Sequence, residues 1–393
     1  MAENGKFSGR EVVIVEAARL PVGRGHEEKG YYKDVHASNL LSKSYSAVVE
    51  RAGIDPSEVE DVVAGCVQQF GEQGINIARN AWLEAGFPVE TPGTTVDRQC
   101  GSAQQAVNFA AALIASGVHD VAIGGGVEHM GHISFADNFA VMQEHGMAFS
   151  PQLMERYDLV PQGISAEMIA DKWEIPRSEL DEIGLRSHQL AAKATEEGRF
   201  EREIVPFAVN GDTYVSDQGI RPDTSLEKLS QLKPAFKEDG KITAGNSSQV
   251  SDGAAAVLLM TREKAGALGL KPRARIYDQT TVGVDPVIML TGPIPATRKL
   301  LERNGMAMDD IDLVEVNEAF ASVVAAWRRE LESDMDRVNV NGGAIALGHP
   351  LGSTGARLIT TLLHEMERSD KEMGLVTMCC GGGLGTGTLI QRV

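Results

Sequence analysis

Cysteine is scarce in this sequence, and long apolar runs are missing from it. The 393 residues contain four cysteines, too few for a disulfide scaffold, and none lies in a C-x-x-C pair or at a metal-ligand spacing from a histidine. No uncharged apolar run reaches the roughly 20 residues of a membrane-spanning helix, and residues 1–10 lack the apolar stretch of a secretory signal. We therefore expect a cytoplasmic protein with no membrane span and no metal site.

Positive charge is also in deficit. The sequence has 37 Lys and Arg against 55 Asp and Glu, a formal net charge of −18, which opposes binding to nucleic-acid phosphate or to an anionic lipid surface. We expect no nucleic-acid partner, and any polyanionic ligand needs a local basic patch. With 42% hydrophobic and 23% charged residues, the chain has the composition of a folded protein. Its 393 residues are enough for about two to three domains.

Glycine, by contrast, is abundant. Many of the 42 glycines follow short β-branched runs, as in VVIVEAA (12–18), DVAIGGG (120–126) and GLVTMCCGGG (374–383). Helical patterns between such runs, for instance at 38–53 and 297–305, end at a glycine in the usual C′ position. This alternation predicts an α/β fold with tight turns from strand to helix.

Two pairs of segments suggest an internal repeat. GIDPSEVEDVVAG (53–65) aligns with GMAMDDIDLVEVN (305–317), and the glycines at 124–126 align with those at 381–383. Both pairs have nearly the same offset, so we predict two similar halves, opened by strands near 12–18 and 273–277. A chance match of short strand patterns is the alternative. Residues 127–249 break the rhythm and indicate an inserted segment, which in α/β proteins usually carries function.

Cys100 stands out among the cysteines. In DRQCGS it follows a strand-like TTV and precedes residues 101–118, which contain no charge and predict a buried helix. A helix N-terminus stabilises a thiolate, so we expect a lowered pKa for Cys100. A packing role is the alternative, and it is our interpretation of Cys66 within VVAGCV. Cys379 and Cys380 end a strand, and either could simply be packed.

His349 and Asn317 are candidates to act with a thiol. His349 lies in the glycine-rich NGGAIALGHPLGSTGAR (341–357), where the backbone can approach a ligand closely. Asn317 and Glu318 begin NEAF at the end of a predicted strand, the edge at which open α/β sheets build their sites. A structural histidine and a turn asparagine are the alternatives. Residues 343–349 lack the lysine of a phosphate loop, and residues 381–387 fail the dinucleotide pattern.

Six ordered motifs together resemble the thiolase family from end to end. They are DRQCGSAQQA (97–106), GGVEHMGH (125–132), TAGNSSQVSDGAAA (243–256), NEAF (317–320), NGGAIALGHPLGSTGAR (341–357) and MCCGGG (378–383). Within the family, GCVQQ (65–69) and NIARNA (76–81) are most similar to degradative 3-ketoacyl-CoA thiolases. The resemblance implies two βαβ-type halves in a layered αβαβα arrangement. It divides the chain into residues 1–121 plus 250–272, a loop domain at 122–249 that covers coenzyme A, and residues 273–393.

The resemblance also implies roles for particular residues. Cys100 matches the acylated nucleophile, His349 its activating histidine, Cys379 the acid/base cysteine, Asn317 the residue that orders a catalytic water, and Gly381 an oxyanion-hole donor; Arg221 in IRPD and Ser248 in GNSSQ match coenzyme A contacts. Two positions depart from the family pattern. Cys379 is followed by Cys380 where an aliphatic residue is usual, and counting back from the glycines favours Cys379. Gln162 stands where similar short-chain members have Met, which weakens a claim of acetoacetyl-CoA specificity.

The implied activity is thiolysis of 3-ketoacyl-CoA by coenzyme A in lipid breakdown, reversible as a Claisen condensation. Coenzyme A is then a substrate, no cofactor is bound permanently, and the chain forms a homodimer or a dimer of dimers, with a hydratase/dehydrogenase subunit as a further partner that the family allows. The alternatives are an acetoacetyl-CoA-specific biosynthetic thiolase, a carrier-dependent ketoacyl synthase and a non-enzymatic acyl-CoA or sterol binding module. A redox switch through a Cys379–Cys380 disulfide is a further alternative.

Overall fold

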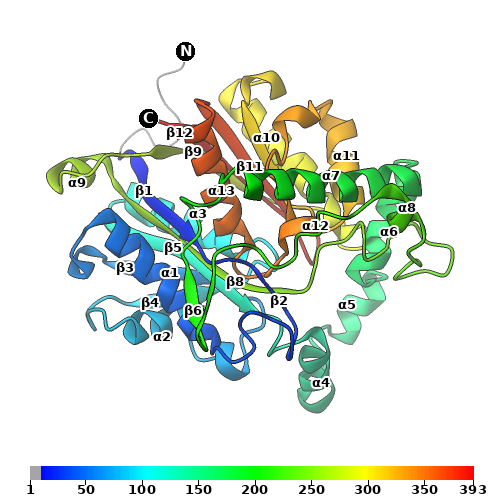
Figure 1. The fold of residues 1–393 in the computed structure, drawn as a ribbon, viewed down its shortest axis with the longest axis horizontal. Coiled ribbons are helices and arrows are strands. Elements are labelled where there is room, and N and C mark those ends of the chain that lie inside the picture. Colours follow the sequence, from blue (N-terminus) through cyan, green and yellow to red (C-terminus); the bar gives the residue numbers. More distant parts are fainter. Residues whose placement is uncertain (1–9) are drawn as a thin grey trace.

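The β-branched runs pair side by side in the computed structural model, which describes residues 10–393 (Figure 1). The first half contributes β1 (Val12–Arg19), β3 (Asp61–Gly65), β4 (Gly93–Val96), β5 (Val121–His129) and β8 (Ser251–Thr261), with the short β2 (Gly23–Arg24) beside β8. The second half contributes β9 (Ala274–Gly283), β10 (Leu313–Val316), β11 (Met373–Cys380) and β12 (Leu384–Arg392). They form one mixed sheet in the order β10-β11-β12-β9-β1-β8-β5-β3-β4.

The strand order contains the same pattern twice. In the first half β3 runs parallel to β5, and β8 lies antiparallel to both β5 and β1. In the second half β10 runs parallel to β11, and β12 lies antiparallel to both β11 and β9. The halves join where Val13 pairs with Arg275 and Ile14 with Ala274. The predicted duplication, with a strand opening each half, is therefore confirmed.

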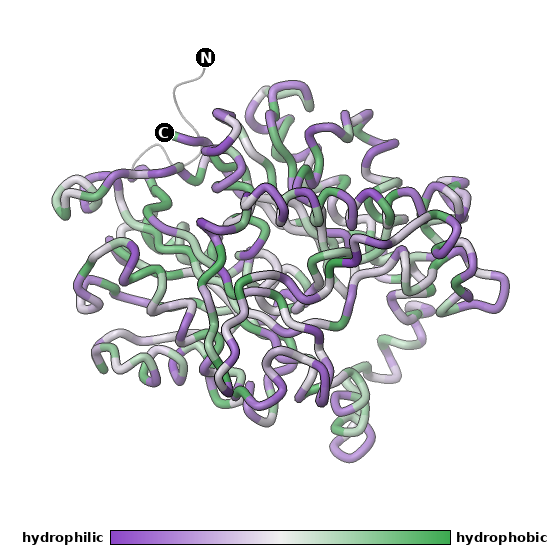
Figure 2. Tube along the Cα trace, viewed as in Figure 1, coloured by the Kyte–Doolittle hydropathy of each residue, from purple (hydrophilic) through white to green (hydrophobic). Residues whose placement is uncertain are grey.

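Helices cover the two half-sheets in three layers. Helices α1 (Ala37–Ala52) and α2 (Ile77–Glu84) pack outside the first half, and α10 (Pro293–Asn304) and α11 (Ala321–Leu331) pack outside the second. Between them lie α3 (Ser102–Ala115) and α13 (Thr354–Arg368), which contact strands of both halves. A separate apolar cluster fills each layer, and Figure 2 shows apolar residues gathered along the central strands and polar ones toward the periphery.

The predicted helix ends agree with the structure, and the central helix agrees in part. Helices α1 and α10 end at Gly53 and Gly305, whose φ angles of 69° and 61° need the left-handed conformation that glycine tolerates. Most of α3 is buried, as expected, but Phe109 is 42% exposed. The expectation of burial all round is wrong for this face because α3 runs beside β4, the edge strand of the sheet.

The chain between β5 and β8 leaves the sheet. It forms α4 (Phe135–His145), α5 (Pro151–Arg156), α6 (Gln162–Lys172), α7 (Arg177–Glu196), the hairpin β6 (Phe207–Val209) and β7 (Asp212–Tyr214), and α8 (Leu226–Ser230). Helices α4 and α5 extend away from the sheet (Figure 1). The predicted domain division stays a prediction, but β5 continues to His129, past the predicted boundary at residue 121.

The remaining elements are short. They are α9 (Arg262–Ala267), α12 (Ala344–Leu347) and the 3-10 turns η1 (Pro56–Glu58), η2 (Gly71–Gln73), η3 (Met289–Thr291), η4 (Met308–Asp310) and η5 (Met335–Arg337). Within residues 10–393 we find no helix with both the length and the apolar character needed to cross a bilayer.

Candidate active site

A cavity of about 500 Å³ opens where the inserted segment meets both halves. Its lining comes from the turn after β5, the starts of α4 and α6, the loop before β8, the loop after β10 and the loop before α13. The lining residues are Met130, Phe135, Pro161, Gln162, Gly163, Phe236, Ser247, Ser248, Gln249, Val250, Ala319, Phe320, His349 and Leu351. A larger hollow of about 720 Å³ lies on another face, but paired charges such as Arg273 and Glu367 line it. The apolar cavity is the better candidate because it contains a predicted catalytic residue.

Cys100 lies at the turn between β4 and α3, as predicted. Gln99 before it has a left-handed φ of 50°, and the turn is held by the N–H of Gln99 donating to Asp97 Oδ1 at 2.6 Å. The thiol is 2% exposed and belongs to the same buried cluster as Met130 and Leu351, which line the cavity with His349.

The electrostatics of Cys100 differ from the expectation. The N–H groups of Gly381 and of Cys100 itself lie near its Sγ, and both act to lower the pKa of the thiol. Burial nevertheless raises the pKa of the Cys100 thiol to about 12. The expected lowering of this pKa is wrong because the cost of removing the charge from water exceeds the stabilisation by these donors.

His349 is held in one tautomer. The hydroxyl of Thr354 donates to the carbonyl of Pro350 at 2.7 Å, so its oxygen is available to accept from His349 Nδ1, also at 2.7 Å. Nδ1 therefore carries the proton, and Nε2 accepts from Asn317 Nδ2 at 3.2 Å. Burial, with a contribution from Arg357, lowers the pKa of His349 to about 3. The ring is a neutral base whose acceptor nitrogen, Nε2, is bonded to the Asn317 amide in this structure.

The two polar residues of the NEAF motif, Asn317 and Glu318, have different surroundings. Asn317 is buried beside His349, and its Oδ1 has no partner among residues 10–393. Glu318 instead accepts hydrogen bonds from Ser187 Oγ, Asn339 Nδ2 and the N–H of Ile345. It therefore holds α7 and the loop before His349 in place and does not line the cavity.

Cys379 and Cys380 occupy opposite faces of β11, as neighbours in a strand must. Cys379 belongs to the buried cluster that contains Ala319 and Phe320, both of which line the cavity. Cys380 Sγ lies against the start of α3, so close that a Cβ on Gly101 would be 2.6 Å from it. Burial raises the pKa of Cys379 well above its usual value, and a charge on Cys100 raises it further. A charge on Cys100 raises the pKa of Cys380 as well, so both thiols lie near Cys100, and the cluster shared with the cavity lining is what favours Cys379 as the acid/base thiol.

The two predicted coenzyme A contacts lie in different surroundings. Ser248 lines the cavity, with its N–H donating to the carbonyl of Ala319 at 2.9 Å. Arg221 is exposed and does not line the cavity; its backbone N–H donates to His188 Nδ1 at 3.1 Å. The structure therefore groups Cys100 with Gly381 and Cys379, and His349 with Asn317 and the cavity residue Ser248, and leaves Arg221 at the surface.

Sequence reasoning missed two residues of this region. Thr354 fixes the His349 tautomer, and the only signal for it is its place five residues after His349, at the start of α13. Gln249 donates from Nε2 to the carbonyls of Gly219, Ile345 and Ala346 and so ties the inserted segment to the loop before His349.

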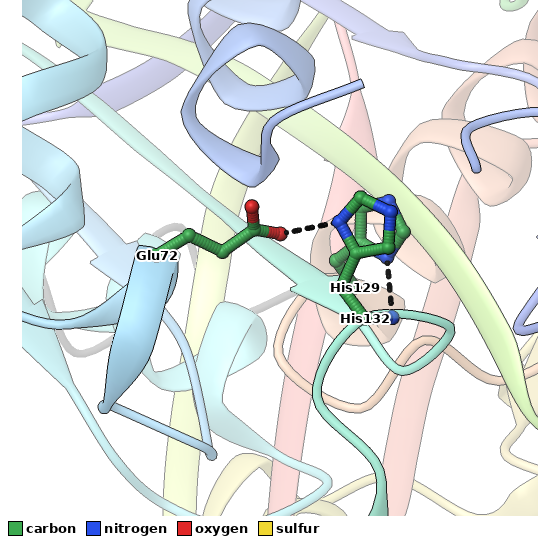
Figure 3. A group of neighbouring side chains, drawn as sticks. All are labelled: Glu72, His129 and His132. Carbon is green, nitrogen blue, oxygen red and sulfur yellow. Dashed lines mark hydrogen bonds and ion pairs between the residues drawn. The ribbon is translucent and has the colours of Figure 1, made fainter. Parts of the chain in front are cut away.

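Glu72, His129 and His132 form a separate cluster near the cavity (Figure 3). Both Nε2 atoms face main-chain carbonyls, of Tyr32 at 3.0 Å and of Lys33 at 2.7 Å. The rings stack with centroids 3.8 Å apart and planes 16° apart. Nearly parallel rings cannot both direct their in-plane lone pairs at one ion, so the cluster is arranged as a hydrogen-bonded anchor for the turn that carries Met130.

This chain is similar to known proteins along nearly its whole length. Residues 12–263 match a family model described as the thiolase N-terminal domain, and residues 270–392 one described as the thiolase C-terminal domain. A steroid 3-ketoacyl-CoA thiolase of Mycobacterium tuberculosis is 46% identical over 389 residues, which cover 98% of this chain and 94% of the relative. A 3-ketoacyl-CoA thiolase of Psychrobacter cryohalolentis is 45% identical over 399 residues, covering 98% and 99%.

A solved structure confirms the predicted fold class. The acetyl-CoA acetyltransferase of Bacillus anthracis superposes with a TM-score of 0.88 at 40% identity, covering 98% of this chain and 99% of the other.

Proposed function

Because this chain belongs to the thiolase family, we propose that it cleaves 3-ketoacyl-CoA with coenzyme A, yielding acetyl-CoA and an acyl-CoA two carbons shorter. The enzyme is an acyltransferase, and the reverse reaction is a Claisen condensation. The observation that carries the proposal is an apolar cavity lined by the neutral imidazole of His349, with two buried thiols, Cys100 and Cys379, that share buried clusters with other residues of its lining.

The first half-reaction forms an acyl-enzyme. His349 Nε2 takes the Cys100 proton while the sulfur attacks the 3-keto carbon, and the N–H groups of Cys100 and Gly381 hold the alkoxide. The alkoxide then collapses and the C2–C3 bond breaks. Cys379 gives its proton to C2, and His349 with a water on Asn317 holds the thioester oxygen of the departing acetyl-CoA.

The second half-reaction returns every group to its starting state. Cys379, now a thiolate, takes the proton of incoming coenzyme A, whose sulfur attacks the thioester on Cys100. The Cys100 sulfur leaves and recovers its proton from His349. The pKa of Cys100 near 12 and that of His349 near 3 support proton transfer during attack rather than a resting thiolate–imidazolium pair.

Coenzyme A enters this scheme as a substrate, with no permanently bound cofactor. We assign Ser248, which lines the cavity, to the pantetheine arm, and Arg221, an exposed cation, to the phosphate end. Arg221→Ala should then raise KM for acyl-CoA severalfold and leave kcat nearly unchanged. An unchanged KM would remove Arg221 from the binding site.

Two of the three similar proteins, at 46% and 45% identity, are named 3-ketoacyl-CoA thiolases, and the acetyl-CoA acetyltransferase is less similar at 40%, which favours degradative substrates over acetoacetyl-CoA. A thiolysis series from C4 to C16 3-ketoacyl-CoA, with one bulky cyclic substrate added, tests this directly. Activity across several chain lengths is expected, whereas a sharp optimum at C4 would favour the acetoacetyl-CoA-specific alternative. Malonyl transfer from a carrier protein without thiolysis would indicate a ketoacyl synthase, and acyl-CoA binding without turnover a binding module.

The chain also self-associates in this proposal. Among residues 10–393, strand β4 pairs on one side only, with β3, and its neighbours include Phe109, 42% exposed, and Ile75, 94% exposed. An open strand edge beside apolar side chains suits a second copy of the same chain. Sedimentation should give a dimer or a dimer of dimers, and a monomer at micromolar concentration would contradict this.

A further inference from the structure

One polar side chain of the cavity has no hydrogen-bond partner among the described residues and no role in the reaction as proposed. The polar lining residues within the described chain are Gln162, Ser247, Ser248, Gln249 and His349. Ser247 donates to the carbonyl of Thr243, Gln249 donates to three carbonyls, and His349 is bound by Thr354 and Asn317. Ser248 is assigned to coenzyme A. The carboxamide of Gln162 makes no hydrogen bond with any residue from 10 to 393.

Gln162 is aimed at the reacting centre. It is the first residue of α6, and its Nε2 would lie 2.9 Å from a Cβ placed on Gly381, the residue whose N–H reaches Cys100 Sγ. The start of α6 is fixed because Gly163 packs on Phe236 so tightly that a Cβ there would be 2.2 Å from the ring. The amide is therefore held beside the acyl group that Cys100 would carry.

Gln162 is half-buried, so water can pair its amide until a substrate displaces that water and supplies a partner of its own. The alkoxide and the thioester oxygen already have donors in the scheme above, so the partner must be another oxygen of the substrate. The described lining residues include no Lys or Arg, and burial lowers the pKa of His349 to about 3. A buried carboxylate would lack a counter-charge here, so a neutral oxygen fits better.

We propose that Gln162 is a specificity-determining residue that selects acyl groups bearing a neutral oxygen, a ketone or a hydroxyl, within the first few carbons beyond the reacting ketone. The proposal rests on the proposed thiolase activity and narrows its substrate class. Its Nε2 donates to that oxygen, while a purely aliphatic chain leaves the donor unpaired.

The test compares three 3-ketoacyl-CoA substrates of equal length: 3-ketohexanoyl-CoA, its 5-hydroxy derivative and 3-ketoadipyl-CoA. The unmodified enzyme should have a kcat/KM about tenfold higher on the hydroxylated substrate than on the plain one, with the dicarboxylic substrate below both. Gln162→Met keeps the side-chain length but removes the donor. It should lower kcat/KM about tenfold on the hydroxylated substrate and leave the plain substrate within about twofold.

Phe135→Leu is the matched control, because Phe135 lines the cavity from α4 rather than from the contact that fixes the start of α6, and the change keeps the lining apolar. It should affect the plain and hydroxylated substrates alike. Equal losses on both substrates in Gln162→Met would overturn the proposal and assign the amide to coenzyme A or to the reaction itself. A preference for 3-ketoadipyl-CoA would overturn the choice of a neutral oxygen. If the unmodified enzyme cleaves none of the three and Cys100 is not acylated, the thiolase activity fails instead.

Discussion

The two halves share a fold but place different chemistry at matching positions. Cys100 lies directly before the central helix α3 of the first half, and His349 lies in the loop before the central helix α13 of the second. Near the end of β5, Glu128 accepts hydrogen bonds from the N–H groups of Val67, Gln68 and Gly352. Near the end of the matching strand β11 stands Cys379.

The two halves place functional residues at similar positions in the fold but give those residues different roles. The repeat indicates where a site forms, because the loops before the central helices and the ends of the parallel strands meet in both halves. It does not indicate which residue does the chemistry. In the first half the strand end anchors loops around Cys100, the proposed nucleophile, and in the second the end of the matching strand carries Cys379, the proposed proton donor.

The largest effect is expected from the first half. Cys100→Ser should lower kcat by about 10⁴-fold or more, because a serine hydroxyl is a far weaker nucleophile than a thiol next to a neutral base. Thiolysis measured by acetyl-CoA formation checks this. Cys66→Ser is the matched control, since Cys66 is buried in the same half but belongs to the outer cluster. Comparable loss in both variants would mean that packing, not nucleophilicity, is lost.

A substitution in the second half should block a different step of the reaction, the proton transfer to C2. Cys379→Ala removes the proton donor for C2 and should lower overall turnover about 10³-fold or more, while Cys100 is still acylated by acetyl-CoA. Mass spectrometry of the acyl-enzyme and isotope exchange at C2 measure the two steps separately. Cys380→Ala should keep both steps within severalfold, because Cys380 faces α3. If Cys380→Ala loses the exchange and Cys379→Ala keeps it, the two thiols are assigned the wrong way round.

A smaller effect should come from the residue that orients the base. Thr354→Val removes the acceptor for His349 Nδ1–H, so part of the population places its proton on Nε2 and cannot accept from Cys100. Cys100 acylation should slow about 10- to 100-fold with little change in KM, and Thr354→Ser should restore most of the rate. A loss that Ser does not restore would indicate a packing role.

The pH profile gives a second readout of the same base. Burial lowers the pKa of His349 to about 3, so its ring is neutral at all higher pH values and becomes protonated only as the pH falls through about 3. The rate of Cys100 acylation should therefore show no loss between pH 7.5 and 5.5 from this histidine. A fall in the acylation rate centred near pH 6.5 would mean that the His349 ring is solvated and has an ordinary pKa.

Features of the fold that depend on local conformation can be predicted from the sequence. Features that depend on burial and on contacts between distant segments cannot. Glycine positions and β-branched runs identify the strands, the ends of α1 and α10, and the turn that carries Cys100, because these depend on local conformation. The raised pKa of Cys100 depends on how many layers bury it, which no local pattern reports. The approach of Gln162 to Gly381 joins the inserted segment to the second half, so it appears only once the chain is folded.

The smallest effect is expected at two matching helix ends, where a substitution should lower the stability equally in both halves. Gly53 and Gly305 end α1 and α10 with φ near +60 to +70°, and a Cβ at either position would meet nothing within 4 Å. Alanine at each site therefore adds backbone strain and no clash, and should lower the free energy of unfolding by about 1 kcal/mol with kcat unchanged. Gly266→Ala is the control, because Gly266 lies inside α9 with equal space and no positive φ, so alanine should stabilise slightly. Chemical denaturation of the three variants measures these differences. Unequal losses at Gly53 and Gly305 would mean that the matching helix ends of the two halves are not conformationally equivalent.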